Sequence, residues 1–388
     1  MLFGCSEVPR RAGVVTAAGV AVVIALVLFL SKTSEEQFIA FDGESEPPEF
    51  PVQAMGTQLD SEPPGDSESK VIELLIRGLP IEGCEPRSPG EREPSNDEEW
   101  RTLLDSAGEK LELTGDPDLL LGAALLNADE ASRWELVSRA LKVLPGNQVA
   151  LWHQLHHCYQ VGCDRDAIET AAIAADESNG MVWLEIASDR IRRGAWREAE
   201  SALRRAISST GFDAYFIEHA MIVERGLAAT TDLDYTNRIM AGIGVSAALA
   251  IPAFGDVSLA CRSGENDGLI WIDLCEELGV KMAGDSRELI SVIVGYGYRR
   301  AAALRAGDPV KADQLEQESS RKQSDLLKAQ ARSGAQALLE NDPAVMQRYV
   351  EYFRAHGELQ AVDFLIEDAR RLRADPTYDQ CNFVGNPD

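Results

Sequence analysis

The feature that most constrains this chain is an uncharged stretch near its N-terminus. From Ala12 to Leu30 the sequence carries no ionisable side chain, and a helix needs about twenty apolar residues to cross the hydrocarbon core of a bilayer. Lipid offers the backbone no hydrogen-bond partners, so a single segment of this kind has to be helical. We therefore expect residues 12–30 to form a transmembrane helix.

The residues around this stretch predict its orientation. Arg10 and Arg11 precede it and acidic residues soon follow it, so the positive-inside rule places residues 1–11 in the cytoplasm and the remainder outside. The junction LFLSKTSEEQF lacks the small residues of a cleavage site. We favour an uncleaved signal anchor in a bacterial inner membrane, with a single pass and a periplasmic C-terminal part. The alternative is a cleaved signal and a soluble periplasmic protein.

Residues 31–99 have the composition of an acidic, proline-rich linker. Between Glu35 and Glu99 there are 18 acidic and 4 basic side chains, and such a segment buries too little apolar surface to offset the cost of ordering its backbone. We expect a disordered, extended stalk. One interruption, Ser69–Ile81, has a helical apolar pattern and is predicted to dock on its own domain or on a partner.

The overall composition favours helices and argues against nucleic acid as a partner. Aromatic residues make up only 6% of the 388 residues and alanine is abundant, which suits helices packed through small side chains better than β-sheets. The formal net charge is -27, so no contiguous face is expected to neutralise phosphates.

An internal repeat predicts the architecture of the folded part. The clearest unit is WLEIASDRIRRGAWREAESALRRAI, Trp183–Ile207. Its large, small and turn residues fall where a tetratricopeptide repeat has them: Trp183, Ile186, Ala187, Gly194, Trp196, Ala199, Leu203 and Ala206. The segment resembles that family, in which small residues let two antiparallel helices approach closely and a glycine lets the chain turn between them.

Further segments follow the same scheme. They are Leu151–Ala175, Trp134–Asn147 as a second helix, Asp116–Leu126 as a degenerate first helix, and Asn341–Pro376. His156 departs from the pattern because it occupies a position that is usually small. The local helix packing is therefore expected to be looser there, or the side chain to be turned aside.

The resemblance implies an all-α fold, a solenoid of helical hairpins. We expect repeats in residues 100–210, diverged helical pairs in residues 211–340, and a C-terminal repeat with a tail in residues 341–388. The uncharged segment Ile239–Phe254 is too short to cross a bilayer and is predicted to be a buried helix.

Six of the seven cysteines follow the anchor, in a compartment where disulfides persist. Six cysteines allow fifteen pairings, and local spacing favours two of them. These are Cys158 with Cys163 and Cys261 with Cys275, which leaves Cys84 with Cys381. The alternative is that several of them are simply small buried apolar residues.

The histidines suggest a binding surface more than a metal site. His153 and His157 are four residues apart on one helix face, but no third ligand follows at a recognisable spacing, so we expect no metal and no cofactor. The repeat register places a set of polar side chains on the inner face of the array, where solenoids bind extended peptides. This partner-binding set is His153, His157, Gln160, Ser188 and Arg192. Ordinary solvated side chains explain the same pattern equally well.

No sequence motif for catalysis is present. A GxSxG elbow, a phosphate-binding lysine loop and a dinucleotide fingerprint are all missing. The expected function is that of a membrane-anchored periplasmic scaffold or assembly factor that binds a protein or peptide partner and is not an enzyme. The alternatives are an envelope enzyme of the peptidoglycan hydrolase type, which would need a pocket holding an acid of raised pKa, and a purely structural tether.

Overall fold

The structure, a computed structural model, describes residues 97–161, 163–249, 251–263 and 269–379. These ranges are helical and contain no strand; two isolated backbone bridges join Asn179 to Gly211 and Phe212 to Ser286. The helices are α3 (Asp97–Glu112), α4 (Pro117–Leu126), α5 (Glu130–Val143), α6 (Gln148–Val161), α7 (Arg165–Asp176), α8 (Gly180–Arg192), α9 (Trp196–Ser208), α10 (Phe216–Thr230), α11 (Tyr235–Ala248), α12 (Pro252–Arg262), α13 (Leu269–Asp285), α14 (Leu289–Arg305), α15 (Pro309–Ser333), α16 (Ala335–Asn341), α17 (Pro343–His356) and α18 (Glu358–Ala374). The all-α prediction is confirmed for this part of the chain.

Short polar residues start many of these helices and glycines end several of them. The side chains of Asp116, Asp164 and Asp342 each accept hydrogen bonds from the first free backbone N–H groups of the following helix, as good N-caps do. Gly194 lies in the turn after α8 and has a φ of +68°, a conformation that residues with a side chain disfavour. The predicted turn between the helices of the clearest repeat therefore lies at Gly194.

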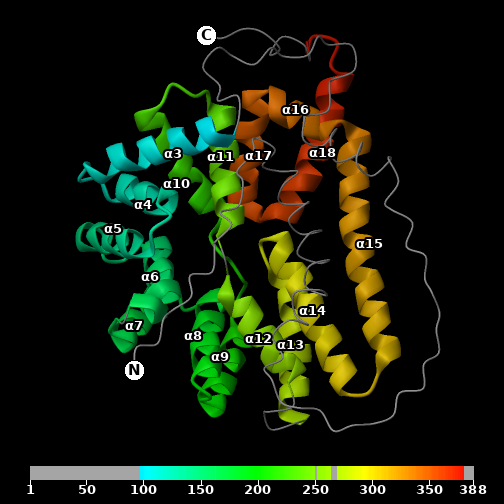
Figure 1. Cartoon of the computed structure of the whole chain (residues 1–388). Coiled ribbons are helices and arrows are strands. Elements are labelled where there is room, and N and C mark those ends of the chain that lie inside the picture. Colours follow the sequence, from blue (N-terminus) through cyan, green and yellow to red (C-terminus); the bar gives the residue numbers. More distant parts are fainter. Residues whose placement is uncertain (1–96, 162, 250, 264–268, 380–388) are drawn as a thin grey trace, which may run out of the picture.

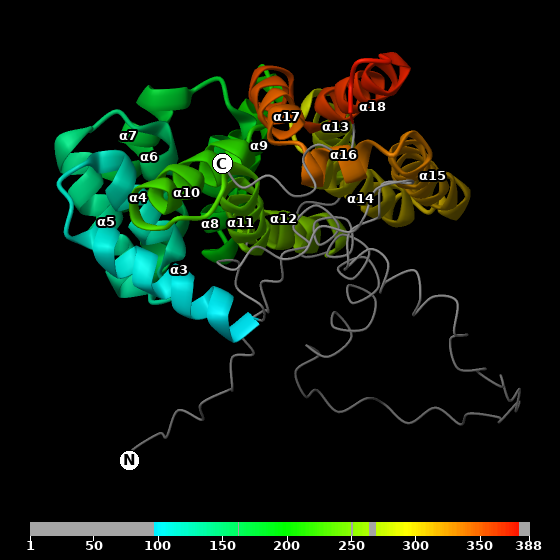
Figure 2. The same ribbon diagram turned by 90° about the horizontal axis from the view of Figure 1, so that it is seen from above.

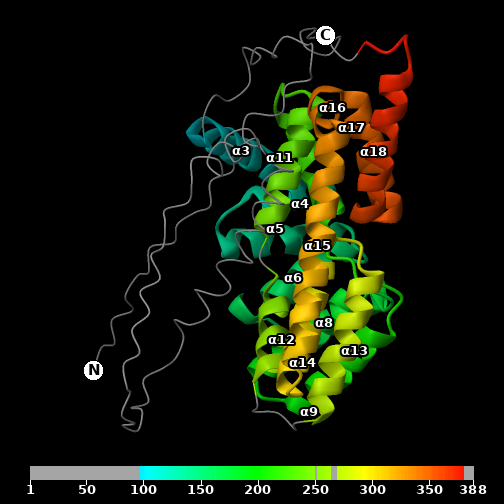
Figure 3. The same ribbon diagram turned by 90° about the vertical axis from the view of Figure 1, so that its right-hand side faces the viewer.

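The helices pack mainly as antiparallel neighbours, and α10 lies among them. In Figure 1, α3 to α7 form one side of the molecule, α8, α9 and α12 to α14 lie together below, and α16 to α18 lie above. Seen from above, α10 and α11 lie between the α3 to α7 group and the α16 to α18 group (Figure 2). The long α15 connects the lower and upper groups along one flank (Figure 3).

The hydrophobic core has separate parts, and two of them share α10. Ile222 and Leu227 of α10 pack with the buried residues of α3 to α6, whereas Ile217 and Ala220 pack with those of α11 and α16 to α18. A third part joins α6 to α9 with α12 to α14. One helix therefore contributes buried side chains to two parts of the core that lie on different sides of it.

Contacts between distant helices distinguish this arrangement from a simple solenoid. Helix α10 packs on α3 and α4, α12 packs on α8, and α13 packs on α9. In a solenoid each repeat contacts only its sequence neighbours. The predicted hairpins α6–α7, α8–α9 and α17–α18 are present, but the chain also folds back on itself between them.

The long apolar segment in the middle of the chain forms two helices. By length and composition Tyr235–Arg262 is apolar enough to cross a membrane, yet it comprises α11 and α12, of 14 and 11 residues. At 1.5 Å per residue each is shorter than the hydrocarbon core. At Gly242 a β-carbon would overlap the backbone of Ala220 on α10, so α11 packs very closely on α10. The segment predicted to be one buried helix, Ile239–Phe254, instead covers the second half of α11 and the first residues of α12.

The predictions for residues 1–11, the 12–30 anchor and nearly all of the 31–99 linker, including Ser69–Ile81, lie outside the described residues.

Candidate functional site

A group of buried imidazoles lies where α6 meets α10. His153, His156 and His157 come from α6 and His219 comes from α10, and none of the four is more than 7% exposed. We call them the histidine cluster. Trp152 packs against three of the rings, with centroids 5.2 to 5.6 Å apart. The chain has five histidines, so this cluster holds all but one of them.

Two members of the cluster form a direct contact between the helices. The Nε2 atoms of His153 and His219 lie 3.0 Å apart, which requires one ring to donate its Nε2–H and the other to accept. Among the described residues, the Nδ1 atom of His153 has no hydrogen-bond partner. A buried lone pair costs less here than a buried N–H without an acceptor. We therefore assign the Nε2–H to His153 and the acceptor to His219.

Burial keeps both of these rings neutral at pH 7. Loss of solvation lowers the pKa of His219 to about 3, with a smaller effect from His156. Loss of solvation also lowers the pKa of His153 well below its ordinary value, and the neighbouring histidines act in the same direction. The pair is therefore a neutral hydrogen bond in a dry environment.

His156 has a different partner. Its Nδ1 atom lies 3.1 Å from a carboxylate oxygen of Glu185 on α8, which is only 1% exposed. The imidazole also stacks on Trp152 at an interplanar angle of 22°. This explains why a histidine fits at a position where the repeat has a small residue: it is buried, and it turns toward Glu185.

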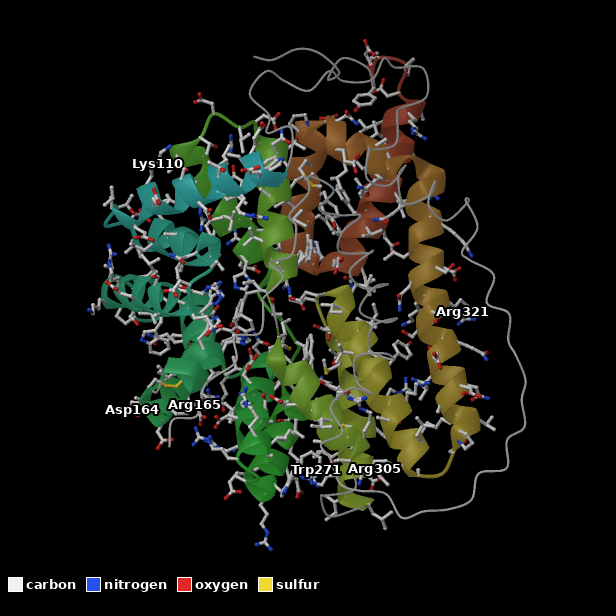
Figure 4. The ribbon with its side chains drawn as sticks, viewed as in Figure 1. Lys110, Asp164, Arg165, Trp271, Arg305 and Arg321 are labelled. Atoms are coloured by element: carbon white, nitrogen blue, oxygen red, sulfur yellow. A yellow bond between two sulfur atoms is a disulfide. The ribbon has the colours of Figure 1, made fainter. Side chains whose placement is uncertain are left out.

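An ion-pair network continues from this point through α7 and α8. Arg165 pairs with Glu169 at 2.9 Å and donates to the backbone oxygen of Leu155 at 2.7 Å. Arg190 bridges Glu169 and Asp189 at 2.6 and 2.7 Å. Figure 4 shows Arg165 at the start of α7, beside α6. These bonds join α6, α7 and α8, and they satisfy charges that would otherwise be costly to bury.

A second polar link joins α8 to α12. The hydroxyl of Ser188, which is fully buried, donates to Asp256, and the guanidinium of Arg192 lies 3.6 Å from the same carboxylate. Ser188 and Asp256 are 68 residues apart in the sequence. These side chains thus hold together two helices that are distant in the chain.

The structure therefore places the predicted partner-binding residues mostly in the interior. His153, His157 and Ser188 are buried, whereas the prediction assumed an open inner face on these helices. The reason is that α10 covers His153 and α12 pairs with Ser188. Arg192 is partly exposed, and the side chain of Gln160 lies outside the described residues. The role of these residues in binding stays a prediction.

A group of carboxyls, one buried and three partly buried, lies where the α9–α10 connection meets α14, α17 and α18. Its members are Asp213, Glu218, Glu288 and Glu358, which we call the carboxyl cluster. Glu288 accepts from the backbone N–H of Ala214 at 2.8 Å, and Glu358 accepts from that of Leu289 at 2.7 Å.

Loss of solvation raises the pKa of the three glutamates of the carboxyl cluster. The pKa of Glu288 is raised well above its ordinary value, first by burial and then by Asp213, to which it is hydrogen-bonded. Burial likewise raises the pKa values of Glu358 and Glu218. Arg287 offsets part of the charge through its ion pair with Asp213 at 3.0 Å.

The carboxyl cluster was missed by sequence reasoning. Its members are spread from Asp213 to Glu358, and no motif connects them. The one available signal was the isolated glutamate directly before an apolar run, as in RELISVIV around Glu288. Glu288 has the raised pKa expected of a catalytic acid, but its contacts anchor the backbone at the start of α14.

Two cysteine pairs lie at disulfide distance, as predicted. The Cα atoms are 5.3 Å apart for Cys158 and Cys163 and 5.8 Å apart for Cys261 and Cys275. The first closes the turn after α6 and the second joins α12 to α13. The pair Cys84 with Cys381 lies outside the described residues.

Metal ligands do not converge in the part of the chain that the structure describes. No three histidine, cysteine or acidic side chains are arranged there to hold one ion. His153 and His219 supply two nitrogen atoms, and a stable transition-metal site requires at least one further ligand.

Comparison of the chain with family models, with curated proteins and with solved structures finds no match.

Proposed function

We propose that this chain is a membrane-anchored periplasmic scaffold or assembly factor, built from tetratricopeptide-like helical hairpins, that binds a protein partner in the cell envelope. The antiparallel hairpins support the proposal, because helices of this kind present broad, rigid faces to a partner.

The observation that carries the proposal is a group of exposed apolar side chains at one end of the helices. We call it the apolar end face: Leu259, Leu269, Ile270, Leu304 and Val310, exposed by 46% to 79%. Single exposed apolar residues are ordinary, but several at one place mark interaction sites.

The ends of four helices bring these residues to the same side of the molecule. Arg305 at the end of α14 donates to the backbone oxygens of Ala260 and Cys261 on α12, at 3.4 and 3.3 Å. The Cys261–Cys275 pair holds α13 beside α12, and α15 begins just after the turn at Gly307. Figure 4 shows Arg305 and Trp271 close together at this end.

The clusters of titratable side chains support binding over catalysis. His153 donates to His219, Glu288 anchors Ala214, and Ser188 donates to Asp256. These groups sit inside the helical packing with their hydrogen bonds directed to other helices. A general acid or nucleophile has to reach its substrate.

The location is supported by two features of the chain. The Ala12–Leu30 stretch has the length and composition of an anchor, and the two cysteine pairs suit a compartment that keeps disulfides oxidised. A reporter that is active only in the periplasm, fused after Asp388, tests the orientation. Activity is expected, and a silent reporter on an expressed fusion contradicts it.

Partner binding is tested by placing charge on the apolar end face. The full-length chain carrying Leu269→Glu and Val310→Glu is crosslinked in native membranes beside the unchanged chain. Leu113→Glu is the matched control, because Leu113 is 89% exposed and lies at the end of α3, away from this face. We expect one crosslinked protein at a fixed ratio to the unchanged chain and to the control, and its loss from the double variant. Equal recovery with all three chains would contradict the proposed surface.

A further inference from the structure

The neutral histidine pair between α6 and α10 is a contact that a proton can break. His153 donates its Nε2–H to His219 across 3.0 Å. A proton added to Nε2 of His219 puts two N–H groups face to face. A proton added to Nδ1 of His153 creates a buried N–H that has no acceptor among the described residues. The first route breaks the hydrogen bond between the two rings, and the second leaves a buried N–H group without an acceptor.

The charges that act on the pair make protonation harder still. His153 is affected by His219, His157 and His156 and by Arg133 on α5, and all of them lower its pKa. His156, which also acts on His219, is the member that faces a carboxylate, Glu185 of α8. The neighbouring imidazoles and Arg133 thus disfavour a further positive charge on His153.

Most of the charged groups on the other elements around α6 and α10 have partners of their own. Arg165 of α7 pairs with Glu169. On α10, Arg225 pairs with Asp118 of α4, and Glu224 pairs with Arg238 of α11. Lys110 of α3 donates to the backbone oxygen of Thr230.

Toward α17, the charges of Asp213, Arg287 and Arg354 act on the pKa of Glu218 of α10. Tyr215, just before α10, donates its hydroxyl to Asp176 at 2.6 Å.

We propose that the His153–His219 contact is an acid-sensitive latch, which holds α6 against α10 near neutral pH and releases it when the surroundings become acidic. Release would expose Trp152 and the part of α10 around His219. Acid would thereby loosen α6 from α10 without acting directly on α16 to α18, while α3 and α4 keep their own packing on α10.

The size of the effect follows from the protonation equilibrium. An exposed histidine has a pKa near 6.5, whereas that of His219 in the closed contact is about 3. Lowering the pH from 7.5 to 5.0 therefore shifts the balance toward the open state by roughly 30-fold through His219 alone. His153 acts in the same direction.

The test is hydrogen exchange of the full-length chain in detergent at pH 7.5 and pH 5.0, measured by mass spectrometry and corrected for the intrinsic exchange rate. We expect backbone amides of α6 to exchange at least tenfold faster at pH 5.0, and those of α17 not to accelerate. Replacing both histidines by glutamine retains a donor and an acceptor near the Nε2 positions but removes the titration. His153→Gln with His219→Gln is expected to abolish the acceleration.

The controls separate the latch from a general effect of acid. His356→Gln removes the exposed histidine outside the cluster and should leave the acceleration unchanged. His219→Gln alone keeps an acceptor for His153, and it serves as the variant if the double change fails to fold. The proposal is overturned if α6 of the unchanged chain exchanges equally fast at both pH values, or if the glutamine variants accelerate as the unchanged chain does.

Discussion

The histidine cluster is buried and the carboxyl cluster is buried or partly buried, yet loss of solvation makes them respond to pH in opposite directions. In each case the low-polarity surroundings favour the uncharged form. For His153 and His219 the uncharged form has one ring N–H in place of two, and for Glu288 and Glu358 the uncharged form is the protonated carboxyl. The same physical cause therefore makes one region sensitive to acid and the other sensitive to base.

The sign of each effect follows from proton linkage. A histidine whose pKa is lowered by folding binds fewer protons in the folded state, so stability is lost as the pH falls below 6.5. A glutamate whose pKa is raised binds more protons in the folded state, so its contribution is present below pH 4.5 and is lost as the pH rises through the folded value. The two regions thus oppose each other between these limits, and only regional or variant measurements separate them.

The largest effect is expected from removing the anchor in the carboxyl cluster. Glu288→Ala leaves the buried N–H of Ala214 without its acceptor and opens a cavity. We expect the free energy of unfolding at pH 5 to fall by about 3 kcal/mol. Urea denaturation followed by circular dichroism measures it. A loss below about 1 kcal/mol would mean that this hydrogen bond does not hold the start of α10 to the start of α14.

The next effect is a pH-dependent difference from the histidine cluster. At pH 5.0 His219 is protonated in the unfolded chain but not in the folded chain. This difference lowers the free energy of unfolding by about 2 kcal/mol relative to pH 7.5. The free energy of unfolding of His219→Gln minus that of the unchanged chain should therefore rise by about that amount when the pH is lowered from 7.5 to 5.0. Because both chains retain the carboxyl cluster, its contribution cancels. A constant difference would contradict the neutral pair.

A smaller effect is expected from Glu288→Gln. The amide keeps an acceptor for Ala214 but carries no charge, so at pH 8 the variant should be more stable than the unchanged chain by roughly 1 kcal/mol. The gain should disappear well below pH 4.5, where Glu288 is protonated in both the folded and the unfolded chain. Denaturation at both pH values provides the measurement, and destabilisation at pH 8 would show that the carboxylate is needed in ionised form.

The smallest effect is expected outside both clusters. His356→Gln changes an exposed side chain at the end of α17, so its unfolding free energy should stay within about 0.5 kcal/mol of the unchanged chain at every pH. The same denaturation series reports it. A pH-dependent change as large as that of His219→Gln would remove the distinction between buried and exposed histidines on which the comparison rests.

Local spacing was enough to predict the helical pairs and the cysteine pairs. The turn at Gly194 and the small buried residues Ala187 and Ala199 follow from positions a few residues apart. Cys158 and Cys163, and likewise Cys261 and Cys275, are separated by only 5 and 14 residues. Such features are determined within one hairpin, where sequence distance and spatial distance agree.

The predicted binding residues depended on contacts that no local pattern encodes. His153 faces His219, which is 66 residues away, and Ser188 faces Asp256, which is 68 residues away. A repeat pattern assumes an open inner face, and nothing in it shows that another helix covers that face.

The position of α10 also determines when the chain can finish folding during its synthesis. Helices α3 and α4 pack on α10, which ends about 100 residues after α4. At ordinary translation rates that segment takes roughly 5 to 20 s to be made. Until then the side chains of α3 and α4 that pack on α10 lack that cover, although α4 already packs on α3 and α5, so these side chains need protection from aggregation while the chain is being made.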